Sequence, residues 1–262
     1  IRLEQDEGNA ADWCQLALMY HSDRKFADAV TFVERSTKAD AQSVLGWQAA
    51  AEIYFQAGFL DRAATANRKL AAISPQLRIT ALQQVVRLEQ QLGRADKAIQ
   101  AAELLVKESP GHADICRQFA DLCFESGRVT DALDCLQKCL LQNPKDYQLG
   151  IELADMLAAQ FQTEQATALL WRTFRITDEL SHRLSLLDPL VRLAQQDESV
   201  DLLIDRLAAF GNQDPVNRSL CVATALKLAG KPTKAHDFLK QSSLQFGHNL
   251  RILRMLVTLA ES

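Results

Sequence analysis

A period of 34 residues is the feature of this sequence that most limits its fold. Three pairs of like residues lie 34 positions apart: Trp13 and Trp47, Tyr20 and Tyr54, and Ala29 and Ala63. Agreement of three pairs at one offset indicates a repeated structural unit rather than a single globular core. Units of this length cannot bury their apolar faces alone, so the pattern predicts a stack in which each unit covers its neighbour.

Glycines and prolines mark the limits of the helices within each unit. The strings GFLDRA, GRADKA, GRVTDA and GKPTKA share a glycine five residues before an alanine. A glycine can adopt the left-handed backbone that ends a helix, and an Asp or Thr near the next start can accept a hydrogen bond from an orphan amide. A proline, which ends a helix by removing an amide donor, closes three units at Pro75, Pro110 and Pro144.

Apolar residues between these turns follow helical spacing, and no segment shows the sustained alternation of a strand. One example is the series Trp47, Ala50, Ala51 and Tyr54. This order of a large residue, small residues, an aromatic residue, a small alanine and a terminal proline resembles the tetratricopeptide repeat. The resemblance implies an all-α, right-handed superhelical solenoid of antiparallel helix pairs. It also implies a protein-binding concave face lined by the first helix of each unit.

We expect one solenoid over residues 1–262, and the fidelity of the repeat varies along it. The repeat is strong over 10–144, degenerate over 145–215 and recovered over 216–248, and an extra helix occupies 249–262. Seven units are expected to start near Ala10, Val44, Ile79, Ala113, Tyr147, Leu184 and Val216.

The degenerate region departs from the pattern at several positions. Phe161 replaces the turn glycine, Asp178 replaces the terminal proline and Leu203 takes the place of the small alanine. Asp188 and Pro189 have the order of a helix cap and a first-turn proline, which predicts a helix start at this point. We therefore expect a lengthened helix or an extra turn near 174–188, and an irregular bend there.

Charge and hydropathy narrow the classes of partner. The net charge of −4 gives no basic field for nucleic acid, and no apolar run approaches the length of a membrane span. The first residue is Ile1, so we expect the sequence to be a fragment of a longer chain, and cysteine usage favours a cytoplasmic location. The terminal helix 249–262 is apolar, which predicts coverage by another repeat, by a partner or by self-association.

Catalytic and metal-binding motifs are absent from the sequence, so the prediction is a protein that is not an enzyme and needs no cofactor or metal. Four cysteines do fall within one unit, at Cys116, Cys123, Cys135 and Cys139. Their spacings lack the short pairs of common zinc sites, and we favour buried thiols that act as small hydrophobic residues. A metal site or a redox pair remains the alternative.

The concave face carries the candidate binding residues. Placing the first helices by their landmarks predicts that these polar side chains face inward: Gln15, Gln48, Glu52, Gln84, Arg87, Arg117, Gln118, Asp121, Glu125, Glu152, Asp155 and Arg192. Glutamine amides can pair with a peptide backbone of any sequence, although glutamine is also a common solvated helix former. The carboxylates would favour a basic segment.

These features predict a non-catalytic scaffold that binds a protein or peptide on its concave face. The alternative is a regulatory or substrate-recruiting arm of a larger enzyme whose catalytic domain lies outside these residues.

Overall fold

The computed structural model describes residues 9–210, 214–247 and 249–260. Within these residues the secondary structure consists of α-helices and turns, and no strand occurs. The all-α class expected from the sequence is therefore confirmed. Contacts between Cα atoms divide the chain into two compact units, residues 1–135 and 136–262. The single solenoid over 1–262 stays a prediction.

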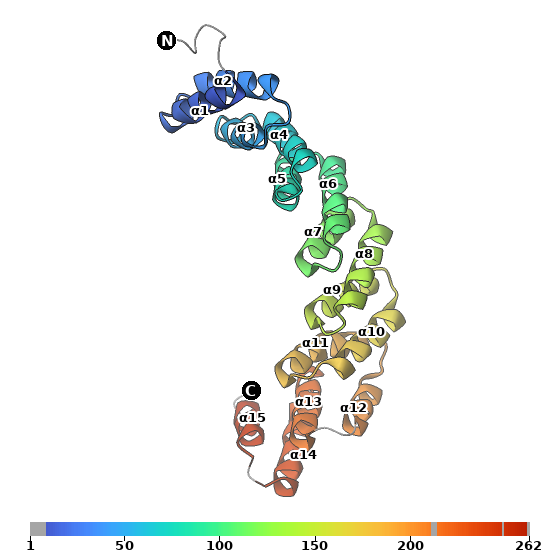
Figure 1. The fold of residues 1–262 in the computed structure, drawn as a ribbon. Helices are drawn as coiled ribbons and strands as arrows, with labels where there is room; N and C mark the ends of the chain where they lie inside the picture. Colours follow the sequence, from blue (N-terminus) through green and yellow to red (C-terminus); the bar gives the residue numbers. More distant parts are fainter. Residues whose placement is uncertain (1–8, 211–213, 248, 261–262) are drawn as a thin grey trace. The chain divides into compact units, whose positions relative to one another are not determined.

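Unit 1 is a series of helix pairs joined by short turns (Figure 1). Consecutive helices pack against each other from the first to the seventh, and the first helices of the opening two pairs are also in contact. The helices are α1 (Ala10–Ser22), α2 (Phe26–Ala39), α3 (Val44–Gln56), α4 (Leu60–Ile73), α5 (Arg78–Gln91), α6 (Ala95–Glu108), α7 (Ala113–Glu125) and α8 (Val129–Gln142), which continues past the unit boundary.

Unit 2 repeats this arrangement with helices of more varied length. Its first helices form a continuous row, because α9 packs on α11, α11 on α13 and α13 on α15. The helices are α9 (Tyr147–Ala159), α10 (Thr163–Ile176), α11 (Leu180–Gln196), α12 (Val200–Ala209), α13 (Pro215–Leu228), α14 (Pro232–Gln245) and α15 (Leu250–Ala260).

The helix starts agree closely with those expected from the repeat. The first helices begin as predicted at Ala10, Val44, Ala113 and Tyr147, and one residue away from the prediction at Arg78 and Pro215. Period and punctuation therefore locate six of the seven first helices.

A small alanine lies near the start of the second helix in six helix pairs. Each of these alanines is completely buried, and they are Ala29, Ala63, Ala98, Ala132, Ala166 and Ala235. The small methyl side chain of alanine lets two helix backbones approach each other closely. In the irregular pair the larger Leu203 occupies this place, and it is also buried.

The turns that follow the first helices require a left-handed backbone. Four of them use glycine at positive φ, and in three others a non-glycine residue adopts φ between +53° and +60°: Arg24, Phe161 and Glu198. An L side chain in this conformation costs about 1 kcal/mol or more. Phe161 is the clearest case, because its ring is 93% exposed and gains little from packing. Phe161 thus takes the place of the turn glycine, as the sequence predicts. The turn keeps the usual left-handed backbone, and the cost is steric strain at Phe161.

Helix α11 corrects the helix start expected at Leu187, Asp188 and Pro189. The helix begins seven residues earlier, at Leu180, and Pro189 lies inside it. Asp188 makes an ion pair with Arg192 at 3.3 Å instead of capping a helix. An internal proline costs about 3 kcal/mol, and the burial of the leucine-rich face of this helix offsets that cost. With 17 residues, α11 is the lengthened helix that the sequence indicates in this region, whereas the bend stays a prediction.

Arg183 explains why α11 can start early. Its side chain is buried, its Nε donates a hydrogen bond to the carbonyl oxygen of Thr177 at 2.7 Å, and its guanidinium lies over the rings of Phe174 and Phe210. The hydrogen bond satisfies a carbonyl at the end of α10, and the rings replace water around the charge. Arg183 therefore joins α10 to α11 where the repeat has no proline.

A buried carboxylate holds the middle of unit 1 together. Glu89 on α5 is completely buried and pairs with Arg68 of α4 and with Arg94 in the turn after α5. Arg94 also pairs with Asp61 at the start of α4, and this arginine lowers the pKa of the Asp61 carboxyl. A charge this deep is tolerated because two guanidinium groups surround it.

The strained turn after α9 leads to a stability prediction. Replacing Phe161 with glycine is expected to raise the free energy of unfolding by about 1 kcal/mol, because glycine adopts positive φ without steric cost. Urea denaturation followed by circular dichroism measures this change.

The preceding residue provides the control. Gln160 has φ of −94°, so the Gln160→Gly variant gains no relief and loses stability through chain entropy. Equal stabilities of the two glycine variants would contradict the assignment of strain to Phe161.

Candidate functional site

A groove in unit 1 is a large candidate for a binding site. Side chains from α1, α3, α4 and α5 line it, and its volume is about 910 Å³. The first helices α1 and α3 lie side by side along it. This arrangement is expected in a stack of helix pairs whose first helices line one face. A cavity of this size can accommodate several residues of a peptide.

Four of the predicted binding residues come together in this groove. Gln15 of α1, Gln48 and Glu52 of α3 and Gln84 of α5 all line it, and all four are exposed. Gln56 donates a hydrogen bond to Glu52 Oε1 at 3.0 Å, which orients the carboxylate along its own helix. The groove thus offers three amides, each with donors and an acceptor, and one negative charge.

Large apolar side chains share the groove with the amides, and they are not among the binding residues predicted from the sequence. Leu45 is 72% exposed, and Leu18 and Phe55 are each 46% exposed. Below them lie small or buried residues such as Ala49 and Ala81. Exposed apolar groups in one concave surface are typical of an interaction site. Helical spacing places these residues away from the core face of α1 and α3. An apolar residue at such a position in the sequence could have indicated them.

The remaining predicted residues of unit 1 lie outside this groove. Arg87 is exposed on α5, whereas Gln118 on α7 is half-buried. Arg117 pairs with Asp114 at 3.1 Å.

Two carboxylates stand one turn apart on α7. Partial burial of its carboxyl group raises the pKa of Asp121, the neighbouring Glu125 raises it further, and Arg117 opposes the shift. Both side chains are exposed at the helix surface. They form a small acidic patch on unit 1.

In unit 2 the predicted acidic face is partly neutralised by the chain itself. Arg192 of α11 pairs with Asp155 of α9 at 3.2 Å and also with Asp188 on its own helix. Glu152 is half-buried. Asp155 therefore adds less unbalanced negative charge than Asp121 and Glu125 do, because Arg192 lies beside it on the next first helix. The role of Asp155 and Arg192 in binding stays a prediction.

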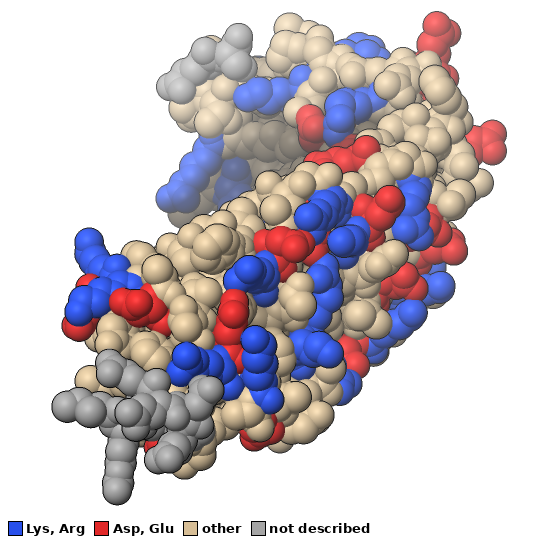
Figure 2. Space-filling model, turned by 90° about the horizontal axis from the view of Figure 1, so that it is seen from above, with Lys and Arg blue, Asp and Glu red and all other residues tan. Residues whose placement is uncertain are grey.

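Charges of both signs are intermixed over the surface that Figure 2 shows, with Lys and Arg beside Asp and Glu. No helix among the described residues has the length and hydropathy to cross a lipid bilayer.

The cysteines are buried thiols. All six have low exposure, as the preferred interpretation of the sequence expects. Burial raises the pKa of Cys14 and Cys123, and raises that of Cys221 to about 11. Among the described residues no three His, Cys, Asp or Glu side chains lie close enough to hold a metal ion. The geometry of this part of the chain therefore gives no support to the zinc alternative.

Comparisons with known proteins identify the repeat. A tetratricopeptide repeat family model matches residues 90–149, which confirms the resemblance found in the sequence. No curated protein matches the sequence.

Solved structures with similar folds share little sequence with this chain. A structure described as Naa15/Naa10 bound to HypK-THB matches with 14% identity and a TM-score of 0.52, covering 97% of this chain and 39% of that chain. YrrB, described as a TPR protein with an unusual peptide-binding site, matches with 15% identity and a TM-score of 0.45, covering 70% of this chain and 94% of its own. PilF of Pseudomonas aeruginosa has 17% identity and a TM-score of 0.41 over 77% of this chain and 93% of its own. At these identities the first match shows the fold alone.

Thiol burial gives a prediction about reactivity and pH. Only the thiolate is nucleophilic, so the native chain should react slowly with DTNB near about pH 8, and all six thiols should react after denaturation. Folded Cys221 keeps its proton to higher pH than an ordinary thiol, whose pKa is 9.0. The unfolded chain therefore loses protons first, and stability should fall as pH rises from 9.0 to about 11.

The Cys221→Ala variant is the control for the pH effect. It is expected to be less stable at neutral pH through lost packing, and its stability should decline less steeply above about pH 9. Rapid labelling of the native wild-type chain would contradict the assignment of buried, protonated thiols.

Proposed function

We propose that this stack of tetratricopeptide-type helix pairs is a protein-binding scaffold that captures a peptide segment of a partner in the groove of unit 1. The observation that carries the proposal is the joint presence of three glutamine amides and three exposed apolar side chains in one groove. Amides and apolar side chains make up most of its lining, and such groups serve recognition.

An extended segment suits this groove better than a helix does. The backbone amides and carbonyls of a helix are already paired with each other, whereas an extended peptide presents them to its surroundings. Gln15, Gln48 and Gln84 stand on three different helices and can pair with successive backbone groups. Leu45 and Phe55 then receive apolar side chains of the peptide, which supply most of the affinity.

Charge adds a preference to this recognition. Unit 1 contains 15 Lys and Arg against 19 Asp and Glu, and Glu52 stands in the groove itself. Asp121 and Glu125 extend the negative charge to α7. A peptide with apolar residues and a basic side chain therefore fits the face, because opposite charges both attract and orient a ligand.

The arm of a larger enzyme remains the alternative function. The matched structure described as Naa15/Naa10 bound to HypK-THB has a chain of which this one spans 39%. A stack of this kind can thus be part of a longer protein, and a catalytic domain outside these residues would be served by the same groove. The complete reading frame distinguishes the two functions. The fragment and the cytoplasmic location stay predictions.

Self-association through the terminal helix also stays a prediction. Helix α15 packs against α13 and α14, and it leaves Leu250 and Val257 exposed. The last two residues of the predicted segment 249–262 lie outside the described part of the chain.

The proposal predicts that binding is lost when the apolar wall of the groove is changed. Peptides selected from a displayed random library against the whole chain should bind the Leu45→Asp/Phe55→Ala variant at least about tenfold more weakly, or about 1.4 kcal/mol. Isothermal titration calorimetry with the selected peptides gives the affinities.

Leu244 of α14 provides the matched control, because it is also a highly exposed leucine and lies in unit 2. The Leu244→Asp variant should bind the selected peptides as the wild type does. Equal affinities for the wild type and the groove variant would exclude the groove as the peptide site.

The acidic patch on α7 gives a second prediction. The Glu125→Lys substitution should weaken the selected peptides that contain Lys or Arg by a few-fold and leave peptides without basic residues unchanged. Asp155→Lys serves as the comparison, since Arg192 already neutralises Asp155 within unit 2. Titrations at low and high salt should show that the difference shrinks as salt rises, and a difference that is independent of peptide charge would contradict the role of this patch.

A further inference from the structure

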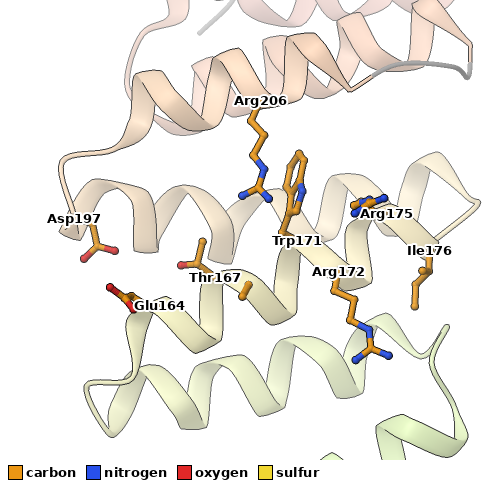
Figure 3. A pocket seen from close by; sticks show the side chains of 9 residues that line it. Glu164, Thr167, Trp171, Arg172, Arg175, Ile176, Asp197 and Arg206 are labelled. Atoms are coloured by element: carbon orange, nitrogen blue, oxygen red, sulfur yellow. The ribbon is translucent and has the colours of Figure 1, made fainter.

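A second cleft lies in unit 2, on the side of the second helices. Residues of α10 and α12 and the residue that ends α11 line it, and its volume is about 710 Å³. It shares no residue with the groove of unit 1. Figure 3 shows its lining, with Trp171 of α10 and Arg206 of α12 near the centre.

Three arginines in this cleft have no carboxylate partner among the described residues. They are Arg172 and Arg175, which stand three positions apart on α10, and Arg206 on α12. Two other cations of unit 2 do have carboxylate partners, since Lys145 pairs with Asp178 and Lys231 pairs with Asp201. Acidic groups of a ligand would be stabilised beside these cations.

Trp171 holds one of these arginines in place. The guanidinium carbon of Arg206 lies 4.3 Å from the centre of the Trp171 ring, and this ring is only 7% exposed. Trp171 is itself stacked on Phe174, with 5.3 Å between the ring centres. A guanidinium stacked on an aromatic ring keeps the N–H groups at its edge for a carboxylate. Arg206 is thus oriented before any ligand arrives.

Negative charge occupies the other end of the cleft. Figure 3 shows Glu164 of α10 and Asp197 at the end of α11 facing each other, away from Arg172 and Arg175. The three guanidinium groups do not converge on one point, since Arg172 and Arg175 leave α10 in different directions. Spread cations match successive acidic side chains better than a single anion, and the carboxylate pair matches a basic side chain.

We propose that this cleft binds an acidic segment of a partner protein, with acidic side chains on the three arginines and a basic side chain between Glu164 and Asp197. A nucleic acid fits less well, because the two carboxylates would repel its phosphates. Unit 2 as a whole is balanced, with 14 Lys and Arg against 14 Asp and Glu, so recognition depends on how charges are arranged in the cleft. The cleft would give the scaffold a second partner surface, separate from the groove.

The test uses a short peptide with a block of glutamates followed by a block of lysines. Its control is a peptide of the same composition in which the two residue types alternate. Two-dimensional NMR of the whole chain follows the indole N–H of Trp171, which the Trp171→Phe variant assigns. We expect the block peptide to shift this signal and to bind at least about fivefold more tightly than the alternating peptide.

Variants of the arginines locate the binding. The Arg172→Gln/Arg206→Gln variant should weaken the block peptide at least about fivefold, whereas Arg254→Gln, which removes an exposed charge from α15, should leave it unchanged. Thermal unfolding checks that both variants remain folded. Both variants should bind the peptides selected for the groove of unit 1 as the wild type does. The proposal for the cleft and the proposal for the groove are therefore tested separately.

Three outcomes would overturn the proposal. In the first, the block and alternating peptides bind with equal affinity. In the second, the cleft variant and Arg254→Gln change the affinity for the block peptide equally. In the third, a single-stranded oligonucleotide binds more tightly than the block peptide.

Discussion

Close packing at a small side chain is the constraint on which the rest of the structure depends. Six completely buried alanines lie near the starts of second helices. A larger residue at these places needs more room between the two helices of a pair. The left-handed turn before the second helix is the companion requirement, and it is kept even where Phe161 must adopt it. The strain at this turn is offset because the packing of the helix that follows it buries apolar side chains.

This packing leaves the first and second helices with different surfaces. The first helices of unit 1 expose amides together with Leu45 and Phe55, and the resulting groove suits an extended, partly apolar segment. The second helices of unit 2 instead expose arginines beside Trp171. A repeat that uses its apolar residues for stacking thus remains free to vary the rest, and each unit can acquire its own recognition chemistry.

Agreement between sequence and structure follows the strength of the local signal. Period, turn glycines and closing prolines locate the helix starts at Ala10, Val44, Ala113 and Tyr147, because each signal acts within a few residues. The start expected near Pro189 is wrong for the opposite reason. There the local preference for a cap competes with burial of a long apolar face and with the contacts of Arg183, and these tertiary contacts prevail.

The binding residues divide in the same way. Sequence alone determined the all-α repeat, the buried alanines and the face on which Gln15, Gln48 and Gln84 stand. Each of these features follows from the spacing of residues along a helix and along the repeat. Only the tertiary structure decided that Arg192 neutralises Asp155, that Leu45 and Phe55 share the groove of the amides, and that Arg206 rests on Trp171. These pairs join residues of neighbouring helices or opposite ends of one helix. Their contacts depend on packing distance and side-chain direction, which periodicity does not contain.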